Sequence, residues 1–150
     1  MLPSSENNVE EAWNYLENRF GVDRERMQEF RIVPNSGDYW LTSKQMETDL
    51  EVETYGFRLL RTTGRGLKPT TYALQFLDGR IEKNIVELDR DELLKLLKRE
   101  EMISREMSEE GYVALEYDGR VVGCGFYKGE KVSSRVPKGR GNELAGVLED

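Results

Sequence analysis

Two strand-like segments that meet at an Asp-Gly turn constrain the fold of this chain most. Residues 112–117 and 120–128 carry Val, Tyr and Phe, which are residue types enriched in β-strands. Between them lies Asp118-Gly119, a dipeptide that favours the tight turn of a β-hairpin. A further short strand is expected around residues 131–135. The sequence therefore predicts antiparallel strands in this part of the chain.

The N-terminal segment predicts two helices. Apolar residues recur at helical spacing through residues 5–20, with Ser4 or Ser5 placed to cap the start and Gly21 to end the helix. Asp23 is expected to cap a short second helix that carries Met27 and Phe30. Residues 30–33 and 39–42 then flank Pro34-Asn35-Ser36-Gly37-Asp38. This arrangement predicts a β-hairpin.

Further short elements follow. Ser43 is expected to cap an acidic helix that ends near Leu50, and residues 55–61 predict a strand. The next segment, TTGRGLKP at residues 62–69, reads as a loop. Thr70 or Thr71 is placed to cap a helix directly after Pro69.

In the second half, residues 85–88 predict a short strand. Asp89 then begins a helix, with Glu92 three residues on, which is the spacing of a capping box. Residues 98–110 are too charged for a core and predict a solvated loop or frayed helix. The chain is therefore expected to be α+β, with one domain at residues 1–80 and another at 81–150 that share an interface.

Charge is segregated along this acidic chain, whose formal net charge is −7. Residues 56–77 hold four basic residues and no acid, and residues 119–141 hold six basic residues and only Glu130 as an acid. Charges are screened over about 8 Å at physiological salt. A nearby polyanion would therefore sense these segments more than the total charge.

The composition excludes several kinds of site. The chain has no histidine and one cysteine, Cys124, so His-dependent triads and cysteine-caged zinc are impossible. Nucleotide-binding glycine motifs are absent, and we expect no cofactor and no catalysis by the chain alone. One cysteine fits a reducing, cytoplasmic setting. No apolar run approaches the ~20 residues of a membrane span, and the first residues do not read as a secretory signal.

The order of motifs in the second half resembles a PUA domain, a small RNA-binding β-barrel. The matching segments are IVELDRDELLKLL and GYVALEYDGRVVGCGFYKGEKVSSRVPKG. The resemblance implies a small α+β, pre-PUA-like domain packed on a C-terminal PUA-like β-barrel. Where many PUA domains have a glycine step after the first helix, this chain has Lys98-Arg99-Glu100. That departure weakens the case for an RNA contact from this loop.

The first half supports a narrower resemblance. GFRLLRTTGRGLKPTTYALQFL is similar to the segment before the PUA domain in Nip-type ribosome-biogenesis factors and in the C-terminal extension of Sun-family RNA cytosine-5 methyltransferases. The tail is similar to the end of that extension at Gly123, Gly125, Gly129, Pro137, Lys138 and Gly139. The methyltransferase core is missing, and Cys124, between two glycines, is expected to be a small buried residue.

These resemblances imply a non-catalytic RNA-binding protein that acts on ribosomal RNA in ribosome biogenesis or rRNA modification. Basic residues would contact the RNA backbone. The candidates are Arg120, Lys128, Lys131, Arg135, Lys138 and Arg140, with Arg58, Arg61, Arg65 and Lys68 either extending that surface or neutralising acids. Tyr112, Tyr117, Phe126 and Tyr127 are candidate stacking groups, although alternation predicts that either Phe126 or Tyr127 is buried.

Two other functions stay open. The chain could be an accessory or detached RNA-targeting domain of an RNA cytosine-5 methyltransferase, or an acidic protein-interaction module. The expected partners are rRNA or tRNA, together with a basic ribosome-assembly protein or a methyltransferase, and no membrane.

Overall fold

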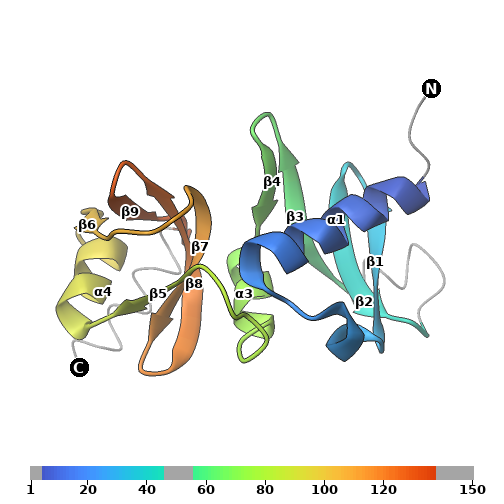
Figure 1. The fold of residues 1–150 in the computed structure, drawn as a ribbon, viewed down its shortest axis with the longest axis horizontal. Helices are drawn as coiled ribbons and strands as arrows, with labels where there is room; N and C mark the ends of the chain where they lie inside the picture. Colours follow the sequence, from blue (N-terminus) through green and yellow to red (C-terminus); the bar gives the residue numbers. More distant parts are fainter. Residues whose placement is uncertain (1–4, 46–55, 138–150) are drawn as a thin grey trace. The chain divides into compact units, whose positions relative to one another are not determined.

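The computed structural model describes residues 5–45 and 56–137, with side chains from residue 9 onward. The described chain forms two compact units (Figure 1). The first reaches Ala73 and includes Gly79–Lys83, while the second contains Leu74–Asp78 and the chain from Asn84 onward. The sequence predicts one boundary after residue 80. In the structure the division is not at a single point, because Leu74–Asp78 belong to the second unit and Gly79–Lys83 to the first. Each unit mixes helices with a sheet, which confirms the α+β class.

The first unit carries a helix and a short 3₁₀-helix followed by an antiparallel sheet. Its strands lie in sequence order, β1-β2-β3-β4. The elements are α1 (Ser5–Phe20), η1 (Arg24–Met27), β1 (Phe30–Asn35), β2 (Asp38–Ser43), β3 (Phe57–Thr63) and β4 (Gly66–Pro69).

The apolar stripe of α1 explains why this segment is helical. Trp13 and Leu16 lie on that stripe and are buried. Gly21 ends the helix with a φ of 67°, a conformation that glycine adopts without steric cost. Asp23 accepts a hydrogen bond from the Glu25 N–H at 3.0 Å and so caps η1 as expected. Phe30 lies in β1 and not in a helix.

The predicted hairpin at residues 30–42 is confirmed, with longer strands and a turn shortened to Ser36-Gly37. Both turn residues have positive φ, 54° and 85°, as a type I′ turn requires. The acidic helix predicted after Ser43 lies outside the described residues.

Residues 62–69, predicted to be a loop, instead form most of a second hairpin. Arg61 pairs with Lys68 and Thr62 pairs with Leu67 across β3 and β4. Threonine is a good strand former, and glycines are ordinary in the turn of a hairpin. Thr70 then caps α3 (Thr71–Phe76), because its hydroxyl accepts from the Ala73 N–H at 3.0 Å.

The second unit is built on a curled, half-barrel sheet with the order β5-β7-β8-β9-β6 (Figure 1). β5 runs parallel to β7, and the other neighbours are antiparallel. The elements are β5 (Ile85–Leu88), α4 (Arg90–Leu97), β6 (Ile103–Ser104), β7 (Gly111–Tyr117), β8 (Arg120–Lys128) and β9 (Lys131–Ser134). Side chains from all six elements form its core, among them Val86, Leu93, Ile103, Val113, Tyr127 and Val132.

The charged segment 98–110 contributes to this core, contrary to its prediction as solvated chain. Ile103 is buried and lies in β6, which pairs with β9. The Met107 N–H donates to the Tyr127 hydroxyl at 3.1 Å. The buried Ile103 and the partly buried Met107 are enough to hold the segment against the sheet.

The other face of the sheet is covered in part by residues Leu74–Asp78. Gln75 donates to the Val122 carbonyl at 3.1 Å, and the Asp78 carboxylate accepts from the Val121 N–H at 3.2 Å. Cys124 lies on this face and is buried. A small buried residue is the role predicted for it.

Glu92 joins the start of α4 to two other parts of the unit. It completes the predicted capping box with Asp89, at 2.8 and 3.2 Å. Its carboxylate also accepts two hydrogen bonds from the Arg105 guanidinium, at 2.7 and 2.8 Å. Arg105 donates as well to the Glu87 carbonyl at 2.8 Å. One ion pair therefore holds the end of β5, the start of α4 and the chain after β6 together.

Replacing Glu92 with Gln should lower the free energy of unfolding at pH 7 by about 2 kcal/mol, because hydrogen bonds to charged groups are strong. The bonds from Arg105 lower the pKa of the Glu92 carboxyl, outweighing the partial burial that raises it. A depressed folded-state pKa gives stability that is full above the unfolded value of about 4.3 and is lost as pH falls through the folded value. Urea unfolding at pH 7 and at pH 3 measures both effects.

Asp91→Asn is the matched control. Its carboxylate is 65% exposed and lies 3.4 Å from the Lys95 ammonium. An exposed pair contributes less than about 1 kcal/mol. Equal losses in the two variants, or a Glu92→Gln loss that does not become smaller as the pH falls, would contradict this account.

Gly125→Ala should destabilise the second unit. A Cβ at Gly125 would lie 2.8 Å from Leu115 Cδ2 and 3.0 Å from the Ser133 carbonyl oxygen, and overpacking of this kind costs about 1–3 kcal/mol. Gly64→Ala is the control, since a Cβ there meets nothing within 4 Å. Urea unfolding of both variants checks the difference, and an unchanged Gly125→Ala midpoint would refute it.

Candidate nucleic-acid interface

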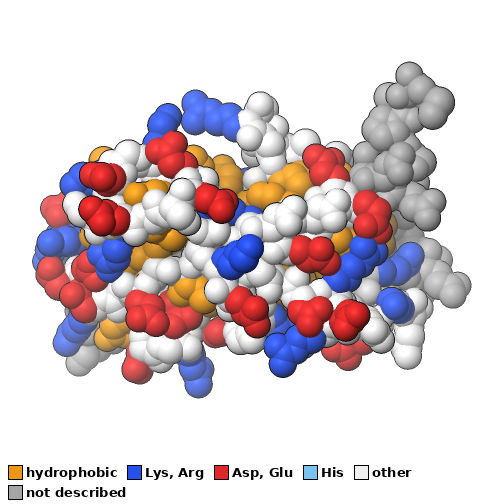
Figure 2. All heavy atoms as spheres, viewed as in Figure 1, with side chains coloured by type: hydrophobic (Ala, Val, Ile, Leu, Met, Phe, Trp, Pro, Cys, Tyr) orange, Lys and Arg blue, Asp and Glu red, His pale blue; other side chains and the backbone are white. Residues whose placement is uncertain are grey.

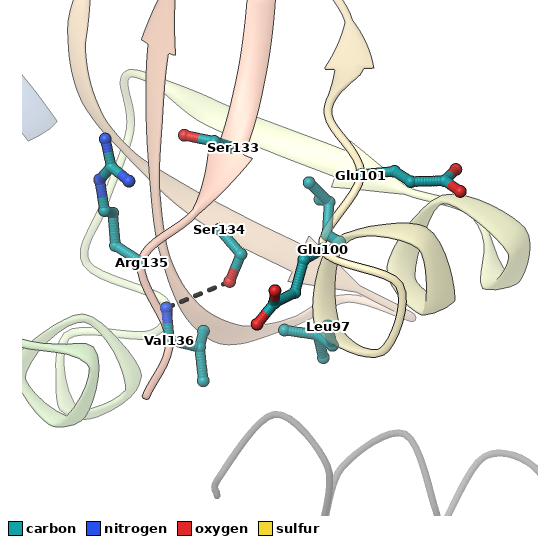
Figure 3. Close-up of a pocket in the computed structure, with 8 residues that line it drawn as sticks. Leu97, Glu100, Glu101, Ser133, Ser134, Arg135 and Val136 are labelled. Carbon is teal, nitrogen blue, oxygen red and sulfur yellow. Dashed lines mark hydrogen bonds between the residues drawn. The ribbon is translucent and has the colours of Figure 1, made fainter. Parts of the chain in front are cut away.

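A groove lies between the end of α4 and the end of β9 (Figure 3). Its volume is about 280 Å³. Leu96 and Leu97 from α4 and Val136 after β9 supply apolar surface. Ser133 and Ser134 add hydroxyl groups beside it. The groove is therefore apolar at its base and offers hydrogen-bonding groups along one wall.

The side chains around the groove point in different directions (Figure 3). Glu100 points toward Val136, whereas Glu101 and Arg135 point away from the groove. The Val136 N–H donates to the Ser134 hydroxyl at 3.1 Å, which fixes the chain as it leaves β9. The Glu100 carboxylate therefore faces into the groove, while the Arg135 guanidinium lies outside it.

The loop after α4 has the backbone shape that the missing glycine would have favoured. Glu100 has a φ of 56°, in the left-handed region where glycine is usual. The Glu101 N–H donates to the Lys95 carbonyl at 2.9 Å and closes the loop. The loop therefore keeps this conformation without a glycine, while the weaker case for an RNA contact from it stays a prediction.

Arg135 and two aromatic rings share the outer face of the sheet. The Arg135 guanidinium lies 5.3 Å from the centre of the Phe126 ring. Phe126 meets Tyr112 edge to face, with ring centres 4.9 Å apart. Tyr127 is buried and Phe126 is half-buried, as the alternation predicts. This cluster supplies one cation held over a π face.

The other predicted basic residues of this unit are not gathered at the groove. Lys128 and Lys131 pair across the turn between β8 and β9, and the Lys131 ammonium donates to the Ser104 hydroxyl at 2.8 Å. Arg120 lies at the opposite end of β8, roughly 25 Å away at ~3.3 Å per residue. Lys138 and Arg140 lie outside the described residues. The structure therefore does not show a single continuous basic surface.

The predicted basic residues of the first unit separate into two kinds. The Arg58 guanidinium lies 3.3 Å from the Asp38 carboxylate and 5.6 Å from the centre of the Trp40 ring. Arg61 and Lys68 face each other across β3 and β4, and Arg65 is exposed in the turn between these strands. Arg58 is engaged in packing within its unit, whereas the other three lie on one hairpin.

Sequence reasoning missed most residues that line the groove. Leu97 and Glu100 belong to one end of the groove, and Ser133 and Ser134 to the other. The two walls are far apart in the sequence, so their proximity could not be predicted. The segment Lys98-Arg99-Glu100, after the first helix of this unit, was the available signal for the site. Figure 2 shows Lys, Arg, Asp and Glu side chains interspersed over the face in view, so charge alone does not mark the site.

The described residues contain no cluster of acidic, cysteine or histidine side chains suited to a metal ion. No helix among them has the length and apolar character of a membrane span.

Residues 83–140 match the family model described as "Methyltransferase RsmF PUA domain". The matched segment coincides with most of the second unit and contains both walls of the groove. It supports the resemblance to PUA domains and to the C-terminal domains of Sun-family methyltransferases, while the resemblance to Nip-type factors stays a prediction. No curated protein matches this chain significantly.

Glu100→Gly should stabilise the protein by about 0.5–1 kcal/mol, because a left-handed conformation is costly for residues with a Cβ. Glu101→Gly is the neighbouring control. The φ of Glu101 is not in the left-handed region. Glycine at this position should therefore destabilise the protein, because it raises the conformational entropy of the unfolded chain. Thermal or urea unfolding compares the two variants, and a loss of stability in Glu100→Gly would contradict the assignment.

Proposed function

We propose that this protein binds RNA without catalysing a reaction, and that it acts on ribosomal RNA during ribosome assembly or rRNA modification. The observation that carries the proposal is the groove between α4 and β9, which lies within the segment similar to a PUA domain. The similarity to a PUA domain is the reason to propose RNA as the ligand.

The chemistry of the groove suits an unstacked base better than a phosphate. Leu97 and Val136 offer apolar contact to a ring, and the Glu100 carboxylate can accept hydrogen bonds from the amino or imino groups of a base. The same carboxylate repels phosphate. Bases that are splayed out of single-stranded loops expose the edges and faces that such a pocket reads.

We expect the phosphate contacts on the outer side of β9, where Arg135 lies. Arg135 is exposed there and its guanidinium is positioned over Phe126. Arginine can contact phosphate through two parallel N–H donors or stack on a base. A side chain already held against a ring loses less conformational freedom on binding.

The absence of catalysis is part of the proposal. The chain has no histidine, and its one thiol, Cys124, is buried, whereas reactive cysteines are partly exposed and close to positive charge. We also propose a cytoplasmic location, which the presence of a single cysteine in the sequence favours.

A second candidate function follows from the family match. The chain would then be an RNA-targeting domain for an RNA cytosine-5 methyltransferase that lacks its own PUA domain. Mixing the purified chain with such a methyltransferase core and measuring methyl transfer to rRNA tests this, because targeting should raise the activity at low RNA concentration. No gain at any ratio of the two proteins would leave the stand-alone RNA-binding protein as the better description.

Arg135→Ala should weaken binding to labelled tRNA and rRNA fragments and reduce the slope of log K against log salt by about 0.7, the value for one phosphate contact to a single strand. Arg135→Lys should keep most of the slope but lose affinity, because lysine cannot form the planar contacts of a guanidinium. Fluorescence anisotropy over a range of salt concentrations measures both quantities.

Arg120→Ala is the matched control, since it removes the same charge from the start of β8, four residues before Cys124, whose carbonyl accepts from the Arg135 N–H. It should change the affinity little. Equal effects of Arg120→Ala and Arg135→Ala would show that the RNA senses only net charge, and no binding by the unaltered chain at low salt would reject the proposed function.

A further inference from the structure

The hairpin formed by β3 and β4 in the first unit gathers three positive charges, on Arg61, Arg65 and Lys68. Arg61 and Lys68 are directly opposite each other across the two strands, an arrangement that destabilises a sheet when the charges are alike. Arg65 adds a third charge in the turn. Among the described residues, no carboxylate forms an ion pair with any of the three. The other basic residue of β3, Arg58, by contrast has Asp38 beside it.

The turn that carries Arg65 is held in a defined shape. The Thr63 hydroxyl donates to the Gly66 carbonyl at 2.7 Å and accepts from the Arg65 N–H at 3.2 Å. Arg61 and Arg65 are both exposed. The hairpin therefore presents its guanidinium groups to solvent from an ordered backbone.

An exposed aromatic ring lies in α3, the helix that follows β4. Tyr72, four residues after Lys68, is 60% exposed. Its ring meets Phe57 edge to face, with ring centres 4.9 Å apart and an angle of 72° between the rings. Phe57 begins β3, the strand that also carries Arg61. The edge-on contact fixes the Tyr72 ring without covering it.

We propose that this hairpin and Tyr72 form a second contact surface for single-stranded RNA, separate from the groove between α4 and β9. Arg61, Arg65 and Lys68 bind backbone phosphates, and Tyr72 stacks on a base. Cations that bind the backbone together with an open ring are the combination that single-stranded nucleic acid uses, whereas an acidic peptide would use the charges alone. The proposal extends the proposed function to a second site, and each site can fail without the other.

The test measures binding of the full chain to a fluorescein-labelled 12-nucleotide single-stranded RNA of mixed sequence, over a range of salt concentrations. Arg61→Ala/Arg65→Ala should lower the slope of log K against log salt by about 1.4, as expected for two contacts at ~0.7 each. Tyr72→Ala should weaken binding roughly tenfold, the size of one stacking contact. Tyr72→Phe keeps the ring and should restore the affinity.

Arg26→Ala/Lys83→Ala is the control for charge. Both residues are exposed and belong to the first unit, and their loss should leave the slope nearly unchanged. Circular dichroism and urea unfolding of each variant confirm that it is folded.

Arg135→Ala is measured in parallel to separate the two sites. If Arg135→Ala weakens binding and the hairpin and Tyr72 variants do not, the second surface is rejected and the groove stands. If the hairpin and Tyr72 variants weaken binding and Arg135→Ala does not, the second surface stands and the groove assignment fails. Equal slope changes in the hairpin and control doubles, or an unchanged affinity for Tyr72→Ala, would overturn the inference.

Discussion

The second unit depends on one carboxylate that serves two purposes. Glu92 completes the cap of α4 and accepts both hydrogen bonds of the Arg105 guanidinium. The cap fixes where the helix begins, and the ion pair fixes where the chain runs after β6. Because the groove lies at the other end of α4, its position relative to β9 follows from these contacts. A half-buried pair joined by two hydrogen bonds is well suited to this role, since its geometry admits few alternatives.

Local chemistry made much of the fold predictable. Asp89 and Glu92 have the spacing of a capping box, and the structure has one. Asp118-Gly119 marks a hairpin turn, and both residues have positive φ. Signals of this kind involve residues close in sequence, so no knowledge of the tertiary structure is needed to recognise them.

Errors arose where partners are distant in sequence or where a composition rule was too coarse. β6 consists of two residues, and it exists because Ile103 pairs with Val132 on β9. Charge around Ile103 suggested solvent, yet one buried side chain decides the position of the segment. The strand at residues 55–61 was predicted, but the end of β3 and all of β4 were not, because Gly64 and Gly66 indicated a loop, although glycines in the turn of a hairpin are ordinary. The candidate site could not be assembled from the sequence for the same reason, since its two walls lie on α4 and β9.

The order of strands in the two sheets has a consequence for how the chain reaches its folded state. In the first unit each strand pairs with the strand next to it in sequence, and such hairpins close within microseconds. In the second unit β5 pairs with β7 and β6 pairs with β9, so α4 and its neighbours must be enclosed before those ladders form. Contacts between distant residues slow folding because loop entropy is lost before they are made. The sheet that carries the groove is therefore the later of the two to form, and newly made chains expose its apolar strands the longest.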